Sequence, residues 1–167
     1  MPGTQTVVAD NGVKLTLLAS EPADTDAITV AELTAGVDIH QQLDANEDFP
    51  FDPSSKEYPA DSWSTGGETP MVRSSRLNYT VGDIHLKSMV DDPDTVRAAF
   101  TANTAMFVCY RVGATDTQDD DWAADDIVHY VPINLGAITD VPKREGHKVY
   151  KVAGSFAGNG KVGTVAA

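Results

Sequence analysis

The sequence has one cysteine and no long hydrophobic run. Cys109 stands alone among 167 residues, which excludes an intrachain disulfide and suits assembly in a reducing cytoplasm. The longest apolar runs, such as 105–110, are far shorter than the roughly 20 residues of a membrane helix. The first six residues carry neither a basic nor an apolar region. We therefore expect no secretory signal and no membrane partner.

Basic residues are scarce as well. Twelve Lys and Arg face 25 Asp and Glu, which gives a net charge of −13. Residues 114–141 hold seven acids and no base, whereas residues 142–167 hold five bases and one acid. Binding to phosphate backbones depends on Lys and Arg that displace condensed counterions. Specific nucleic-acid binding is therefore disfavoured, and a solvated acidic surface is expected.

Motifs for catalysis are also missing. The four histidines, at 40, 85, 129 and 147, lack the close pairing of a zinc site. There is no Gly-x-Ser-x-Gly elbow, phosphate-binding glycine loop or dinucleotide fingerprint. Cys109 lies in the most apolar segment, where a cysteine behaves as a small hydrophobe. We predict no catalytic residue, no metal site, no cofactor and no enzymatic activity.

An acidic run is the best candidate for chemistry. A calcium loop of the EF-hand type needs a glycine at its sixth position and a glutamate at its twelfth. Counted from Asp116, these positions hold Asp121 and Ile127, so the register fails. We expect this run to be a solvated loop, or a surface that faces a molecule to which it must not adhere. Weak cation binding is the alternative. The run comprises Asp116, Asp119, Asp120, Asp121, Asp125 and Asp126.

Alternation of apolar and polar residues predicts a mainly β fold, a sandwich or barrel, in a single domain over 1–167. Ala105–Val112 is apolar on both faces, as in a central strand. One short flanking helix is expected near 93–102, with Pro93 in its first turn, an apolar face that includes Phe100, and a left-handed terminator at Asn103. The other expected strands are Val13–Leu17, Ile28–Glu32, Val37–Leu43, Arg76–Val81, Ile84–Val90, Ile127–Ile133, Lys148–Phe156 and Val162–Ala166.

A long loop is expected at about 44–70. Its four prolines disfavour strand pairing, and its length is unusual for a compact domain. It nevertheless carries four aromatic residues, Phe49, Phe51, Tyr58 and Trp63. Two interpretations remain open: the rings fold back onto their own domain, or they dock on a neighbouring subunit, where aromatic residues are enriched.

Four stretches resemble the major tail proteins, or tail tube proteins, of siphophages, particularly those of actinobacterial hosts. They are Ala31–Ile39, with its Thr-Ala-Gly-Val-Asp-Ile turn, the strand–helix–strand Ile84–Val112, the strand Lys148–Phe156 and the ending Val162–Ala167. The resemblance implies a β-sandwich-like fold with a flanking helix. It also implies hexameric rings that stack into a hollow tube through which genomic DNA passes at ejection.

The implied partners are further copies of the chain, the tape measure protein, and the tail tip or terminator proteins. Double-stranded DNA would pass without specific binding, through a virion tail assembled in the host bacterial cytoplasm. A lumen wide enough for DNA needs more strands than a porin of 16–18 strands, which 167 residues cannot supply alone. An acidic lining would let phosphates pass without adhesion.

The charge pattern suggests how such subunits meet. We expect some of the basic residues of 142–167, with Lys143 and Arg144 as candidates, to contact acidic loops of an adjacent subunit, while the remaining acids face the lumen or the solvent. Charge reversal there should impair stacking more than reversal at Lys14, and both variants should fold. Two alternative functions remain: another virion or surface β module, such as a head-decoration, spike or adhesin domain, and a small hydrolase that uses scattered carboxylates.

Overall fold

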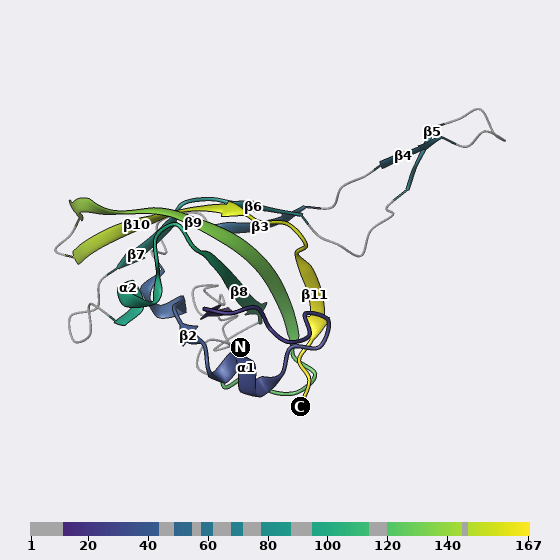
Figure 1. The fold of residues 1–167 in the computed structure, drawn as a ribbon, viewed down its shortest axis with the longest axis horizontal. Helices are drawn as coiled ribbons and strands as arrows, with labels where there is room; N and C mark the ends of the chain where they lie inside the picture. The colour runs from purple at the N-terminus through teal and green to yellow at the C-terminus, as the bar shows by residue number, and fades with distance from the viewer. Residues whose placement is uncertain are drawn as a thin grey trace, which may run out of the picture.

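A curved antiparallel sheet forms the body of the computed structural model (Figure 1). The structure describes residues 12–43, 49–54, 58–61, 68–71, 78–87, 95–113, 120–144 and 147–167. The strand order is β2-β1-β8-β9-β10-β7, and β11 also pairs with β9. These strands are β1 Val13–Leu18, β2 Val37–Asp38, β7 Ile84–Lys87, β8 Ala105–Val112, β9 Ile127–Arg144, β10 His147–Phe156 and β11 Lys161–Thr164. The predicted mainly β fold is confirmed.

β9 is much longer than the predicted strand Ile127–Ile133. It continues for 18 residues, because β10 pairs with its second half as far as Arg144. Pro132 is tolerated because the neighbour of β9 changes there. Along β9, the pairing with β11 runs from Ile127 to Tyr130, and the pairing with β10 runs from Ile133 onwards. A register shift in the β9–β10 pairing adds a bend. The result is a long curved hairpin.

The predicted strand Ile28–Glu32 is wrong, because helix α1, Val30–Thr34, begins inside it. Thr29 and Glu32 form a reciprocal capping box: the backbone N–H of Thr29 donates to Glu32 Oε2 (2.9 Å), and that of Glu32 to Thr29 Oγ1 (3.3 Å). The predicted strand Val37–Leu43 is also too long. It ends at Asp38, and a 3₁₀ turn, His40–Gln42, follows.

Helix α2, Thr95–Ala99, confirms the predicted flanking helix over part of its length. Phe100, directly after it, is buried in the core. Asn103 has a left-handed backbone with a φ of 59°, as predicted for the terminator. Asp92 and Pro93, the expected start of the helix, lie outside the described residues.

The prediction that the prolines disfavour strand pairing in 44–70 is wrong. β3, Phe51–Ser54, pairs with β6, Asn78–Val81, and β4, Tyr58–Asp61, pairs with β5, Glu68–Met71. Pro59 stands opposite Pro70 in the β4–β5 ribbon. Alternate pairs in an antiparallel ladder exchange no hydrogen bond, so two prolines can share one such pair. Figure 1 shows the β4–β5 ribbon standing away from the main sheet.

The sheet buries side chains on both faces. One face packs against the β3–β6 ribbon and the end of α2, through Phe51, Tyr79 and Phe100. The opposite face is covered by α1 and the loop after β8, through Leu33 and Trp122 among others. β8 alternates between the two clusters and lies between β1 and β9, which confirms the predicted central strand.

A polar network fixes β2 against β1. Trp122 Nε1 donates to Thr16 Oγ1 (2.9 Å), whose hydroxyl donates to Asp38, and Lys14 Nζ lies 3.3 Å from the other carboxylate oxygen of Asp38. A Cβ at Gly36 would lie 2.6 Å from Leu18 Cδ2, so glycine is required where β2 approaches β1. These contacts explain the Thr-Ala-Gly-Val-Asp-Ile turn.

Candidate assembly interface

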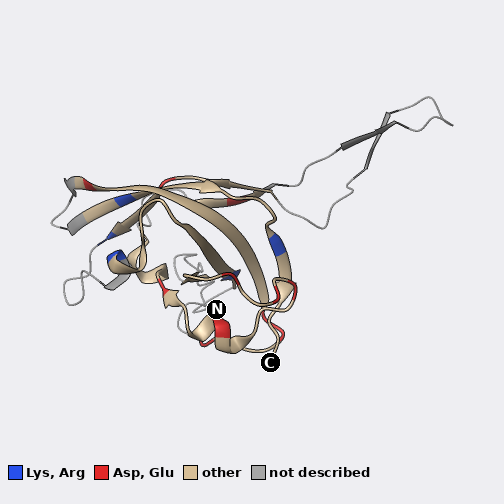
Figure 2. Ribbon diagram, viewed as in Figure 1, with Lys and Arg blue, Asp and Glu red and all other residues tan. Residues whose placement is uncertain are grey.

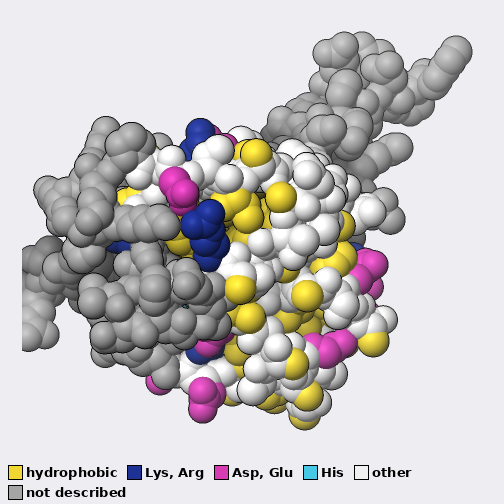
Figure 3. All heavy atoms as spheres, turned by 60° about the vertical axis from the view of Figure 1, so that its left-hand side comes forward, with side chains coloured by type: hydrophobic (Ala, Val, Ile, Leu, Met, Phe, Trp, Pro, Cys, Tyr) yellow, Lys and Arg dark blue, Asp and Glu magenta, His cyan; other side chains and the backbone are white. Residues whose placement is uncertain are grey.

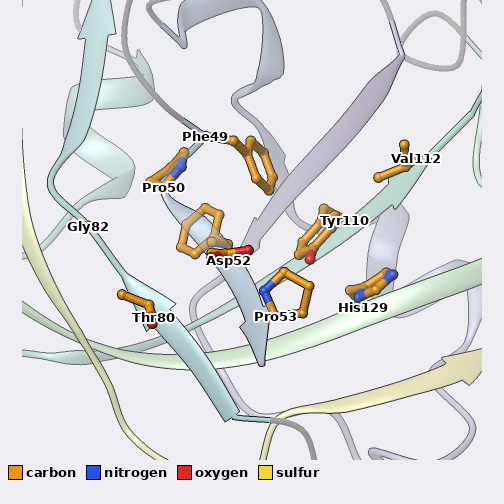
Figure 4. A pocket seen from close by; sticks show the side chains of 10 residues that line it. Phe49, Pro50, Asp52, Pro53, Thr80, Gly82, Tyr110, Val112 and His129 are labelled. Atoms are coloured by element: carbon orange, nitrogen blue, oxygen red, sulfur yellow. The ribbon is translucent and has the colours of Figure 1, made fainter. Parts of the chain in front are cut away.

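An apolar recess opens beside the start of β9. Its volume is about 520 Å³, and the ends of β3, β8 and β9 surround it. In Figure 4, Pro50 and Thr80 lie on one side and Tyr110, Val112 and His129 on the other, with Phe49 and Pro53 between them. Asp52 is the single carboxylate of this lining. The recess can therefore hold an apolar group with a cation beside it.

Aromatic stacking makes the floor of the recess rigid. The Tyr110 ring stacks on the His129 ring with centroids 4.5 Å apart, and Phe49 meets Tyr110 edge-on at 5.2 Å. Tyr79 Oη lies 3.0 Å from His129 Nδ1. Burial lowers the pKa of His129 and raises the pKa of Tyr79 to about 12. At neutral pH the floor is therefore uncharged.

Exposed apolar side chains gather around this recess. Among the described side chains, the exposed large hydrophobic ones are Phe49 (39%), Val112 (65%), Ile127 (62%) and Val162 (43%). Val112 follows Tyr110 by two residues, Ile127 precedes His129 by two, and Val162 pairs with His129. Strand alternation therefore places these side chains on the sheet face of the Tyr110–His129 stack. This apolar area is therefore a candidate interaction site.

Acidic residues gather at one end of the molecule. In Figure 2 the acids are concentrated around α1, the neighbouring loops and the C-terminus, and Figure 3 shows acids mainly at the edge of the visible face. We call this group the acidic end. Its members are Glu21, Asp24, Asp26, Glu32, Asp120, Asp121, Asp125 and Asp126.

Arg111 organises the described part of the acidic run. It is 8% exposed, forms an ion pair with Asp126 and donates to the carbonyl oxygens of Asp120 (2.9 Å) and Asp121 (3.2 Å). Asp126 also accepts from the backbone N–H of Ala123 (2.8 Å). Asp126 is thus engaged within its own chain, whereas the side chains of Asp120, Asp121 and Asp125 are exposed. Asp116 and Asp119 lie outside the described residues.

The four aromatic residues proposed for an interface have different positions. Phe51 is 0% exposed and stacks on Tyr110, so this ring folds back onto its own domain and has no surface left for a neighbour. Phe49 is exposed at the mouth of the recess. Tyr58 belongs to β4, but its side chain is not among those described, and Trp63 lies outside the described residues.

The basic residues also differ from one another. Lys143 and Arg144 end β9 at the tip of the β9–β10 hairpin, although their side chains are not described. Lys151 pairs with Asp83 (3.0 Å) and Lys161 with Asp26 (2.7 Å), so both have partners in their own chain. Lys14 is 4% exposed and pairs with Asp38, so the expectation that its reversal leaves the fold intact has no support from its position.

Val112, Ile127, His129 and Val162 were missed as candidates for an interface. The available signal was the period-2 pattern around the 113–126 loop, where Val112 and Ile127 continue the buried face beyond Tyr110 and His129. Sequence alone did not show that the β3–β6 ribbon stops short of these positions. That boundary depends on tertiary packing.

Within the described part of the chain, no group of three or more His, Cys, Asp or Glu side chains could hold a metal ion. Cys109 is fully buried, and burial raises the pKa of its thiol to about 12, which suppresses the reactive thiolate. The described helices include none that is long and apolar enough to cross a membrane.

A curved β-rich body, an exposed apolar area and an acidic end fit a structural protein. The family model for phage tail tube proteins matches residues 1–167, so the chain belongs to that family. It is a structural protein of a bacteriophage tail, a component of the virion that builds a tube together with other tail proteins. No curated protein matches the chain in sequence.

Proposed function

We propose that this chain, acting as one domain over 1–167, forms hexameric rings that stack into the tube of a siphophage tail. The tube serves as the channel for double-stranded DNA at ejection. Its assembly in the host bacterial cytoplasm involves the tape measure protein and the tail tip or terminator proteins. The subunit itself catalyses no reaction and needs no cofactor.

The exposed apolar area at one end of the molecule supports this proposal most directly. Phe49, Val112, Ile127 and Val162 expose apolar surface beside a recess, and association is the ordinary means of burying such surface. A ring or stack joins two different surfaces of one subunit, so the partner surface must lie elsewhere on the molecule.

The strand count supports a shared wall. A closed sheet of 16–18 strands is needed for an aqueous channel in porins, and the main sheet here has seven strands. Several subunits are required to enclose DNA, and six copies supply enough strands. The exposed acids Asp120, Asp121 and Asp125 are candidates for the lumen or for solvent-facing loops. Carboxylates there would keep phosphates from adhering.

Negative-stain electron microscopy and sedimentation of purified protein over a range of concentrations test this function. We expect monomers in dilute solution, and rings or tubes at high concentration or with a tail-tip nucleus. Rings should show six-fold averages and an open centre. Monomers alone under every condition, or closed compact dimers, would contradict the proposal.

A further inference from the structure

The recess lies near the start of β9, and two basic residues stand at the end of this strand in the sequence. His129, in the floor of the recess, is near the start of the strand, and Arg144 is its last residue. Fifteen residue steps at about 3.3 Å each separate them by roughly 50 Å along the strand. A continuous paired strand cannot fold back onto itself. The hairpin tip can therefore reach this recess only on another copy of the chain.

The chemistry of the two surfaces also matches. By sequence the hairpin tip reads Val141-Pro142-Lys143-Arg144-Glu145-Gly146, an apolar pair followed by two bases, one acid and a glycine, with a net charge of +1. The recess is lined by aromatic and proline side chains with one exposed carboxylate, Asp52. The chain that leads into Phe49 is itself acidic and reads Asp-Ala-Asn-Glu-Asp at 44–48.

Charge argues for a second copy at this particular place. Two copies with a net charge of −13 each repel one another unless oppositely charged or uncharged surfaces meet. The exposed apolar area provides an uncharged surface, and the exposed carboxylate of Asp52 lies in the lining of the recess beside it. The hairpin tip, with Lys143 and Arg144, is the basic counterpart at the opposite end of β9.

We propose that the tip of the β9–β10 hairpin of one subunit docks in the recess lined by Phe49, Tyr110, Val112 and His129 of the next. This inference rests on the proposed tube and names the surfaces by which its subunits meet. The two surfaces are different. When the tip of one copy docks in the recess of a second, the recess of the first and the tip of the second therefore stay free for further copies. Such a contact continues into a ring or a stack and does not end at a dimer.

Site-directed crosslinking tests the contact directly. A Val112→Cys variant places a thiol at the exposed mouth of the recess, and a Pro142→Cys variant places one at the tip while keeping Lys143 and Arg144. Cys109 is fully buried with a raised thiol pKa, so the parent chain gives little background. The two variants are mixed, assembled and treated with a short bismaleimide. The matched control pairs Val112→Cys with Ala31→Cys, an exposed position on α1.

We expect crosslinked dimers from the Val112/Pro142 pair at about tenfold or more the yield of the control pair, because a docked contact raises the local thiol concentration. Microscopy of the same samples separates the two proposals. Tubes without this crosslink would overturn the docking contact and leave the tube intact. A failure to assemble at any concentration would overturn both.

A double variant, Val112→Cys with Pro142→Cys in one chain, tests the geometric argument. In dilute monomer it should give no intrachain crosslink, since β9 holds the two positions apart. An intrachain crosslink in monomer would show that the tip meets its own recess, and would overturn the proposal.

Discussion

Lys14 is a buried charge on β1 that pairs with Asp38, a carboxylate of β2. Its side chain is 5% exposed, and Asp38, its partner at 3.3 Å, is 44% exposed. Thr16 also donates to Asp38, so this carboxylate joins β1 to β2. A buried charge that loses its partner is costly because water cannot replace it.

We therefore predict that Lys14→Glu destabilises the monomer by about 3 kcal/mol, since it places a carboxylate at a buried position beside the partly exposed carboxylate of Asp38. Urea unfolding of dilute protein measures the change. Lys151→Glu is the matched control: Lys151 also pairs with an aspartate, at 3.0 Å, but both side chains are more than a third exposed. That variant should lose about 0–1 kcal/mol. Equal losses in the two variants would disprove the role of burial.

His129 makes the stability of the folded chain depend on pH. Burial lowers its pKa below the ordinary value of 6.5, so the unfolded chain binds the proton more readily than the folded one. The stability from neutral His129 is complete above pH 6.5 and is lost as pH falls through 6.5 towards the folded pKa.

A His129→Gln variant should remove this dependence while keeping a polar side chain near Tyr79. The loss of the stack on Tyr110 should cost about 0.5–1.5 kcal/mol at pH 7.5. Because the parent loses stability on acidification, the difference between the two proteins should shrink between pH 7.5 and 5.5. Urea unfolding at several pH values measures it. A difference that stays constant with pH would contradict the assignment to His129.

At the scale of elements, regular alternation was predictable and local exceptions were not. β8 has the bounds that its apolar pattern indicates, and β1 and β10 differ from prediction by one residue each. α1 was missed although Thr29-Val30-Ala31-Glu32 has the spacing of a capping box. The apolar Ile28 and Val30 suggested a strand, whereas the reciprocal hydrogen bonds favour a helix.

The long strand β9 and the ribbons of 44–71 escaped prediction for another reason. Pro132 and Pro142 lie inside β9, and Pro53, Pro59 and Pro70 lie inside shorter strands. Proline signals a strand end only if its missing N–H is needed for pairing. Which N–H groups are needed depends on register, and register depends on partners far away in the sequence. A single sequence cannot supply that information.

The β4–β5 ribbon stands away from the main sheet, and Trp63 lies in the sequence between these strands. We predict that Trp63→Ala weakens tube formation and leaves the monomer folded, because we expect the indole to contact a neighbouring subunit. Sedimentation at increasing concentration measures assembly, and urea unfolding measures the fold. Trp122→Ala is the contrasting change: Trp122 is 5% exposed and donates to Thr16, so its loss should destabilise the monomer. Unfolding of the Trp63 variant would place its ring in the chain's own core.

For the whole molecule, the sequence predicted the sign of the charge and its separation along the chain, but not the pairing of individual residues. By sequence, the bases of 142–167 formed one group of candidates for contacts between subunits. In the structure, Lys151 and Lys161 of this group form ion pairs with aspartates of their own chain. Arg111, on β8, forms an ion pair with Asp126 and donates to the carbonyl oxygen of Asp120, and the sequence did not indicate either contact. Lys143 and Arg144 keep the position that the proposal requires, at the end of the longest strand.

Salt should act on assembly in two opposite ways. Copies with a net charge of −13 repel one another, and added salt weakens this repulsion. A contact between Lys143 and Arg144 and an acidic neighbour is weakened by the same salt, because the Debye length falls from about 8 Å at physiological ionic strength to about 3 Å at 1 M. Each exposed pair contributes only about 0–1 kcal/mol, but a ring repeats every contact. We expect the repeated short-range contact to dominate, so tube growth should slow as salt rises.

A charge-matched pair of variants isolates that contact. Lys143→Gln with Arg144→Gln changes the net charge by −2, and so does Thr101→Glu with Ala157→Glu, two exposed positions outside the hairpin tip. Both variants repel their own copies equally, so light scattering of tube growth against salt compares them directly. At low salt the Gln variant should assemble less than the Glu variant, and the difference should vanish by about 1 M, where the contact is screened. If the two variants behave alike at every salt concentration, net charge alone governs assembly and the hairpin tip makes no ionic contact with its neighbour.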